Sequence, residues 1–214
     1  MRPFLLVLSS PSGGGKTTIA KALLASRSDV GYSVSATTRA PRPGEKDGRD
    51  YHFLAAAEFE RRVKAGEFLE HATYGGNHYG TLRSEVVRVL EGGRHVVLDI
   101  EIDGARQVRE RMPDAVRVFV LPPSAEVLVS RLRSRDTESV EARRLRLSLA
   151  AEELRAASEY DYVVVNEELG AAVRAVGAIL DAESTRVARQ RDLAALIETL
   201  RRGVAEAAAR GDAV

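Results

Sequence analysis

The sequence predicts an α/β fold in which helices flank a parallel sheet. Four apolar runs of strand length are spread along the chain, and segments with helical spacing of apolar residues separate them. A run that is apolar at every position is typical of a strand buried on both faces, as in a parallel sheet. Alternation of such strands with helices indicates βαβ units, so we expect a helix-flanked parallel core.

The elements follow in order along the chain. We expect strands at residues 4–8, 95–99, 116–121 and 162–165, and helices at about 16–25, 103–111, 125–134 and 140–157. The stretch 33–93 breaks this pattern, because it is rich in turn residues and mixes aromatic with polar side chains. We interpret it as an inserted, mixed α/β lobe. The expected division is a core of residues 1–32 and 94–190, the lobe at 33–93, a mobile basic helical lid at 124–147 within the core, and a helical tail at 191–214.

Composition excludes several classes of protein. The 214 residues are 44% hydrophobic and 29% charged, which is ordinary for a soluble globular domain. The net charge is only +1, so we expect no nucleic-acid partner, and any anion site must be local. Cysteine is absent, which removes disulfides and thiolate sites and suits a cytoplasmic location. The apolar run 4–8 is too short for a signal peptide or a membrane span, so no membrane partner is expected.

A glycine-rich loop follows the first expected strand and opens the first expected helix. It reads Ser10-Pro11-Ser12-Gly13-Gly14-Gly15-Lys16-Thr17-Thr18. Glycines let the backbone curl so that successive N–H groups point at phosphate oxygens, and the helix N-terminus adds positive potential. This context predicts a phosphate-binding loop, or P-loop. The pattern has glycine at its first position, where this chain has Ser10, so the backbone geometry of that turn stays open.

The P-loop predicts ATP and Mg²⁺ as ligands. Lys16 would bridge the β- and γ-phosphates, and the Thr17 hydroxyl would face Mg²⁺. The expected ATP-binding residues are Ser12, Gly13, Gly14, Gly15, Lys16, Thr17, Thr18 and, beyond the last core strand, Asn166, for which a turn role is nearly as well supported. The chain contains no Asn-Lys-x-Asp string, which argues against a GTPase of the switch type.

Several further segments give the chain a family resemblance. It resembles guanylate kinases from Ser33 to Phe53, and again in the segments Glu67-Phe68-Leu69-Glu70, Gly76-Asn77-His78-Tyr79-Gly80-Thr81, Leu98-Asp99-Ile100-Glu101-Ile102-Asp103-Gly104-Ala105 and Ser158 to Asn166. About nine-tenths of the chain is covered, and only the tail is unmatched. The resemblance implies transfer of the γ-phosphoryl group of ATP to GMP or dGMP, on a P-loop core with an inserted GMP-binding lobe.

The resemblance also implies the GMP-binding residues. Arg39, Arg42, Tyr51 and Tyr79 would hold the GMP phosphate, which suits guanidinium forks and phenolic donors. Ser35, Glu70, Thr81 and Glu101 would read the base. Guanine presents N1–H and N2–H₂ donors beside its O6 acceptor, so a carboxylate such as Glu70 satisfies the donors. Adenine reverses this pattern, and selectivity for GMP over AMP is expected.

The remaining expected site residues serve phosphoryl transfer, which needs alignment and charge neutralisation more than proton transfer. Asp99 ends an expected buried strand and would act on the Mg²⁺ hydration shell, beside Thr17. Arg131, Arg135 and Arg144 match the lid arginines of the family and would supply positive charge. The segment between the last two is about two residues shorter than the common family form, and Arg143 adjoins Arg144, so which of these two faces the phosphates stays open.

Two other functions remain as alternatives. Guanylate-kinase-like domains in scaffold proteins bind peptides without catalysis, although those domains generally lack an intact P-loop. A kinase of another small acceptor, such as a ribose phosphate, could use the same core, but it should lack the set Ser35, Glu70 and Thr81. The histidines are scattered without metal-ligand spacing, so no zinc site is expected. The oligomeric state stays open, a homo-oligomer included.

Overall fold

The core of the protein is a parallel sheet. The computed structural model of the chain describes residues 1–133 and 140–210. In this part of the chain the sheet comprises β1 (Leu5–Ser9), β2 (Val30–Tyr32), β7 (His95–Asp99), β8 (Val116–Leu121) and β9 (Tyr162–Val165), in the order β2-β7-β1-β8-β9. Each neighbouring pair is parallel. The carboxyl ends of the strands therefore meet along one edge, where ligands bind in folds of this kind.

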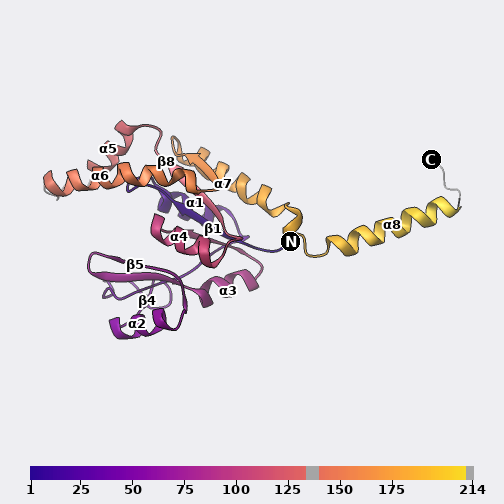
Figure 1. Cartoon of the computed structure of the whole chain (residues 1–214), viewed down its shortest axis with the longest axis horizontal. Coiled ribbons are helices and arrows are strands. Elements are labelled where there is room, and N and C mark those ends of the chain that lie inside the picture. Colours follow the sequence, from indigo (N-terminus) through magenta and orange to yellow (C-terminus); the bar gives the residue numbers. More distant parts are fainter. Residues whose placement is uncertain (134–139, 211–214) are drawn as a thin grey trace.

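Helices cover both faces of this sheet (Figure 1). They include α1 (Lys16–Ser26) and α7 (Leu169–Ser184) on one face, and α3 (Arg83–Glu91) and α4 (Ile102–Arg111) on the other. Successive side chains of β1 alternate between the faces: Leu6 and Leu8 pack with the α1 and α7 cluster, and Leu5 and Val7 with the α3 and α4 cluster. Burial on both faces explains why this strand is apolar throughout.

A second sheet belongs to the lobe. Its strands are β3 (Ser35–Thr37), β4 (His52–Phe53), β5 (Phe68–Tyr74) and β6 (Asn77–Leu82), in the order β4-β3-β6-β5. β3 and β4 are parallel, whereas β6 is antiparallel to both β3 and β5. Helix α2 (Ala56–Lys64) covers one face through a small cluster that contains Ala36, Phe59, Phe68 and Leu82. The lobe lies on one side of the core, and α5 and α6 lie on the opposite side (Figure 1).

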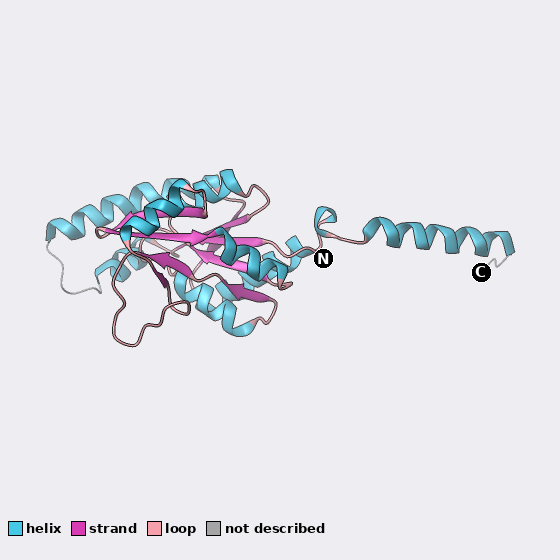
Figure 2. Cartoon of the chain, turned by 90° about the horizontal axis from the view of Figure 1, so that it is seen from below, coloured by secondary structure: helices cyan, strands magenta, loops and turns pink. Residues whose placement is uncertain are grey.

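The rest of the described chain is helical. It comprises α5 (Ala125–Arg133), α6 (Val140–Arg155), α8 (Leu193–Arg210) and short 3-10 turns at Ala156–Glu159 and Val187–Arg189. Helix α8 projects away from the body of the molecule (Figure 2). Its apolar side chains at Leu196, Ile197, Leu200 and Val204 are 46–70% exposed. The tail thus extends from the core without packing its apolar residues against it.

The sequence-based prediction of the core is confirmed. The four expected strands are present, the first shifted by one residue to Leu5–Ser9, and the four expected helices begin within one residue of their predicted starts. The fourth gives way to the 3-10 turn Ala156–Glu159 after Arg155. The short edge strand β2 was not predicted. Among the described helices, none combines the length and the apolar character that a membrane span requires.

Candidate active site

The glycine-rich loop connects β1 to α1 at the carboxyl edge of the parallel sheet. The loop closes through a hydrogen bond from Gly14 N to Pro11 O at 2.8 Å. Gly13 and Gly15 adopt φ angles of 82° and 96°, a left-handed conformation that costs little only for glycine. The helix begins at Lys16, directly after the loop. The unpaired N–H groups of its first turn therefore face the same space as the loop amides, as anion binding requires.

Ser10 is accommodated at the first position of the loop. Its side chain is buried, and its hydroxyl donates to Pro11 O at 2.9 Å. In the described part of the chain no residue other than glycine has a positive φ, so Ser10 is not strained. The hydroxyl instead requires a small neighbour, because a Cβ on Gly14 would lie 2.6 Å from the Ser10 Cβ. The departure from the usual loop sequence therefore leaves the loop closed and its backbone unstrained at Ser10.

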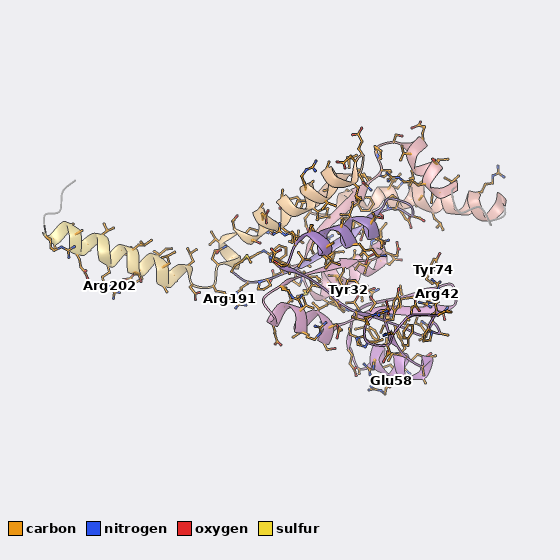
Figure 3. The ribbon with its side chains drawn as sticks, turned by 180° about the vertical axis from the view of Figure 1, so that it is seen from behind. Tyr32, Arg42, Glu58, Tyr74, Arg191 and Arg202 are labelled. Carbon is orange, nitrogen blue, oxygen red and sulfur yellow. The ribbon has the colours of Figure 1, made fainter. Side chains whose placement is uncertain are left out.

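A cleft of about 1610 Å³ opens beside this loop. The P-loop and the first turn of α1 form its floor, the start of α4 and the end of α6 form its walls, and Tyr51 and Tyr74 of the lobe reach it from the far side. Figure 3 shows Tyr74 and Arg42 at the same end of the lobe, with Glu58 on its outer side. The cleft is large enough to hold a nucleotide between the core and the lobe.

Two carboxylates accept hydrogen bonds from donors of the P-loop. Glu101, which precedes α4, accepts a hydrogen bond from Lys16 Nζ at 2.6 Å. Glu153 of α6 accepts one from the Ser12 backbone N–H at 2.9 Å. Both contacts present anionic oxygens where the loop would hold phosphates. Glu101, expected with the base-reading residues, thus lies against the P-loop lysine, and its own side chain is 64% exposed.

Arg131 and Asn166 both contact the backbone of the loop. The Asn166 side chain is buried and donates from Nδ2 to Gly14 O at 3.0 Å, and Arg131 donates to Gly14 O and to Asn166 O at 3.5 and 3.3 Å. Both residues also line the cleft. Of the other expected lid residues, Arg144 is exposed on α6, whereas Arg135 and the side chain of Arg143 lie outside the described residues.

Thr17 and Asp99 offer oxygen ligands of the type that Mg²⁺ prefers. Thr17 is exposed to the cleft on the first turn of α1. Asp99 ends β7 in register with Leu8 of β1, so it stands beside the strand that leads into the P-loop. A hydroxyl and a carboxylate next to a phosphate site fit a hydrated magnesium ion. Among the described residues, no three His, Asp or Glu side chains gather as a protein-only metal site would require.

The expected base-reading residues of the lobe lie side by side on one face of its sheet. Thr81 of β6 pairs with Ser35 of β3 on one side and with Glu70 of β5 on the other. Residues that pair across strands project to the same face. The Thr81 hydroxyl donates to Glu70 Oε1 at 2.6 Å. The three side chains therefore form a row that offers both hydroxyl donors and carboxylate acceptors.

A β-bulge places Glu70 in this row. The register of β5 against β6 shifts between Phe68 and Glu70, and Phe68, Leu69 and Glu70 are all buried. The bulge allows Phe68 to pack in the lobe cluster and Leu69 in the core cluster. Burial raises the pKa of the Glu70 carboxyl, against which the Thr81 hydroxyl lowers it. A buried carboxylate is suited to a ligand that brings N–H groups.

The expected phosphate-binding residues gather at the next position along the same face. The ring centroids of Tyr51 and Tyr79 are 6.2 Å apart, and Arg39 Cζ lies 5.4 Å from the Tyr51 centroid. Arg39 is held by Glu45 at 2.9 Å. Burial raises the pKa of Tyr51, so its hydroxyl stays a neutral donor at physiological pH. Arg42 is exposed at the loop that carries this group.

Glu45 was missed by the sequence analysis. Its carboxylate accepts from the Arg39 side chain and, at 2.8 Å, from the Arg42 backbone N–H. The signal was present in the turn Arg42-Pro43-Gly44-Glu45, since proline followed by glycine with positive φ brings the first and fourth residues together. Glu45 therefore orients the loop that presents both arginines.

A P-loop at the edge of a parallel core, facing a lobe with its own polar row, defines a phosphotransferase of the nucleoside monophosphate kinase class. The guanylate kinase family model matches residues 2–183. The chain is 53% identical to the guanylate kinase of Symbiobacterium thermophilum, with 92% of each chain covered, and 49% identical to that of Paramagnetospirillum magneticum, with 94% and 95% covered. It also matches the crystal structure of guanylate kinase from Anaplasma phagocytophilum at 38% identity and a TM-score of 0.72, over 92% of this chain and 94% of that one. The chain belongs to the guanylate kinase family.

Proposed function

We propose that this protein transfers the γ-phosphoryl group of ATP to GMP or dGMP, giving ADP and GDP, in cytoplasmic purine nucleotide metabolism. The observation that carries the proposal is the row of Ser35, Thr81 and Glu70 on the lobe, which accompanies a donor site built on the P-loop of the core. A donor site alone would fit many nucleotide-binding proteins. The row would add recognition of one particular nucleotide as the acceptor of the phosphoryl group.

Base selection follows from the chemistry of the row. The buried Glu70 carboxylate would accept N1–H and N2–H₂ of guanine. The Ser35 hydroxyl would donate to O6, since the Thr81 hydroxyl already donates to Glu70. Adenine would present its unprotonated N1 to that carboxylate, and the mismatch costs about 1–3 kcal/mol per buried unpaired group. We therefore expect strong discrimination against AMP.

The phosphate of the acceptor would lie between the arginines and tyrosines of the lobe. Arg39 and Arg42 supply charge, and Tyr51 and Tyr79 supply neutral donors. Glu45 orients the Arg39 guanidinium through both of its carboxylate oxygens and holds the backbone N–H of Arg42. This arrangement would hold the acceptor oxygen in place and would leave the opposite side of the phosphate to the P-loop.

On the donor side, Lys16 would leave Glu101 and bind the β- and γ-phosphates, and the loop amides would cradle the same phosphates. Glu101, once released, is free to take part in base recognition. Thr17 and Asp99 would hold Mg²⁺, which neutralises charge on the phosphates when bound. Arg131 would add positive charge at the transferring group, with Arg135 and Arg144 of the lid. Asn166 would keep the loop and Arg131 in register, because its side chain donates to Gly14 O and its backbone carbonyl accepts from the Arg131 guanidinium.

The acceptor range tests the proposal directly. Release of ADP is measured with ATP, Mg²⁺ and, in turn, GMP, dGMP, AMP, UMP and ribose phosphates. We expect turnover with GMP and dGMP and little with the others. Equal rates with AMP would contradict the assignment of Glu70, a preference for ribose phosphates would identify another kinase, and peptide capture without any turnover would favour a binding module.

A further inference from the structure

One face of helix α4 docks on edge strand β5 next to Glu70. The residues of this face are Gly104, Gln107 and Arg111, which recur at helical spacing. Gln107 Nε2 donates to His71 O at 2.9 Å, and Gln107 Oε1 accepts from His71 N at 3.2 Å. Arg111 donates to Leu69 O at 2.8 Å. The helix therefore binds the backbone on both sides of Glu70.

These bonds replace a missing strand. β5 is at the edge of the four-stranded sheet, so β6 pairs it on one side only. The outward backbone groups of an edge strand otherwise face solvent. Gln107 satisfies both groups of His71, as a neighbouring strand would do. The backbone position of Glu70 thus depends on a side chain from the core.

Gly104 leaves the room that the Glu70 carboxylate occupies. A Cβ built on Gly104 would lie 2.8 Å from Glu70 Oε2 and 3.4 Å from its Cδ. Gly104 is helical and has no positive φ, so its backbone does not require glycine. Glycine in a helix costs roughly 0.5–1 kcal/mol relative to alanine. Since backbone geometry does not explain the glycine, the space beside Glu70 does.

We propose that Gly104 and Gln107 are positioning residues for guanine recognition, which set where the Glu70 carboxylate stands in the base-reading row. Gly104 sets the position of Glu70 Oε2, and the Thr81 hydroxyl holds Glu70 Oε1. Gln107 fixes the backbone of β5, the strand to which Glu70 belongs. Neither residue is placed against the donor phosphates. This inference rests on the proposed function, because it assumes that Glu70 reads the purine.

The first test is Gly104→Ala. The added methyl group displaces the carboxylate, so the KM for GMP rises about tenfold while the KM for ATP is unchanged. Selectivity for GMP over inosine monophosphate, which lacks the 2-amino group, falls by a similar factor. Gly203→Ala is the matched control, because Gly203 is also helical and a Cβ there meets no atom within 4 Å. The control is expected to keep wild-type constants.

A double variant separates a local clash from general damage. Glu70→Asp alone shortens the carboxylate and weakens GMP binding. In the Gly104→Ala background the shorter side chain relieves the clash, so the double variant is less impaired than the two single effects combined. Effects that simply multiply would argue against contact between these two side chains as the cause.

Gln107→Glu provides an independent test. Glutamate keeps the acceptor for His71 N but loses the donor to His71 O, so the backbone of His71 is held by one bond instead of two, while Arg111 still holds Leu69 O. We expect a rise of about threefold or more in the KM for GMP, again with the KM for ATP unchanged. If Gly104→Ala proves too unstable for kinetics, as melting curves would reveal, Gln107→Glu carries the test.

The outcomes separate this inference from the proposed function. Suppose that Glu70→Gln loses selectivity while Gly104→Ala and Gln107→Glu keep the wild-type KM values for GMP and inosine monophosphate. The positioning role is then overturned, and the proposed function stands. If either variant raises the KM for ATP as much as that for GMP, its effect is general and the role is also overturned. If the wild type itself does not prefer GMP over inosine monophosphate and AMP, the proposed function fails first.

Discussion

At the scale of single residues, two carboxylates bind the hydrogen-bond donors of the P-loop. Glu101 binds Lys16, and Glu153 binds the Ser12 amide. The Lys16 side chain is only 12% exposed, so the pairing offsets part of the desolvation of a charge held close to other donors. Binding of ATP then exchanges one anion for another. The positive charge of Lys16 is therefore paired both with Glu101 and with the phosphates that replace it.

Lys16→Ala is expected to reduce turnover by about 100-fold or more, because the variant loses a charge aimed at the transferring phosphate. GMP affinity should change little, since Lys16 is assigned to the donor side. Coupled ADP release and calorimetric titration with GMP measure the two effects. Lys21→Ala, on the exposed side of the same helix, is the control. Turnover retained in Lys16→Ala would remove the loop from the mechanism.

Glu70→Gln is expected to weaken selectivity for GMP about 10- to 100-fold and to stabilise the free protein at neutral pH. Burial raises the pKa of Glu70 above its unfolded value, so the folded state binds this proton more tightly than the unfolded state does. The stability that comes from this tighter proton binding is fully present below the pKa that Glu70 has in the unfolded state. It is lost as the pH rises through the pKa that Glu70 has in the folded state.

The amide of Glu70→Gln carries no charge, and its free energy of unfolding should lose this pH dependence. Urea denaturation between pH 4 and about pH 8 measures the difference. Glu91→Gln, at an exposed position, serves as the control. Stability that falls in Glu70→Gln at neutral pH would mean that the carboxylate is compensated in the free protein, contrary to the direction given by its burial.

The sequence was sufficient to predict which residues belong to the candidate site, but not which groups each of them contacts. Ser35, Glu70 and Thr81 come together in the structure as a paired row. Glu101 instead lies on the P-loop lysine, and Asn166 contacts the loop backbone. Such placements depend on how separate elements meet, and no local pattern encodes that.

At the scale of elements, the apolar runs and helical spacing of the core were sufficient to locate its strands and helices. Strand β2 escaped because it has three residues and ends at an exposed tyrosine. The lobe strands were not located individually, since the bulge makes three consecutive residues of β5 buried and so removes the alternation that marks a half-buried strand. Gly104 was quoted only within a motif; its role depends on a helix–strand contact.

Phe59→Ala is expected to loosen the lobe before the core. Phe59 is 1% exposed, its ring lies 4.4 Å from that of Phe68, and the cluster around it is small. Loss of a buried phenylalanine costs about 3–5 kcal/mol, more than so small a cluster tolerates. We expect GMP affinity to fall while ATP affinity persists, with faster amide exchange in β5 and β6.

Leu196→Ala is the control for Phe59→Ala, because Leu196 is 55% exposed on α8. It should change neither nucleotide affinity nor exchange in the lobe. A single cooperative unfolding step in Phe59→Ala, with both affinities lost together, would show that the lobe and the core unfold as one unit and would contradict the expectation.

At the scale of the whole molecule, the tail is separate from the machinery. Figure 3 shows Arg191 where the chain leaves the body and Arg202 well out along α8. Removal of residues 191–214 should therefore leave kcat and both KM values within about twofold of the full chain. Steady-state kinetics of the shortened protein measures this. A larger loss of activity would assign the tail a part in the reaction.

The boundary of this deletion is set by Arg189, which belongs to the core. Arg189 binds the buried Glu183 at 3.1 Å and stacks over Phe4 at 4.1 Å. Arg189→Ala should lower the free energy of unfolding by about 2–3 kcal/mol, in contrast to loss of the whole tail. Chemical denaturation of the two variants makes the comparison.

The lobe is attached to the core along one edge of its sheet, strand β5. Helix α4 binds the backbone of residues 69–71, so the end of the lobe sheet that carries Glu70 is anchored to the core. The strand at the other edge, β4, is the farthest from that anchor. Any rotation of the lobe about its anchored edge therefore sweeps Tyr51 and the arginine loop through a wider arc than Glu70. In the proposed binding mode the purine would therefore stay close to the rotation axis, and the acceptor phosphate would move farther than the purine.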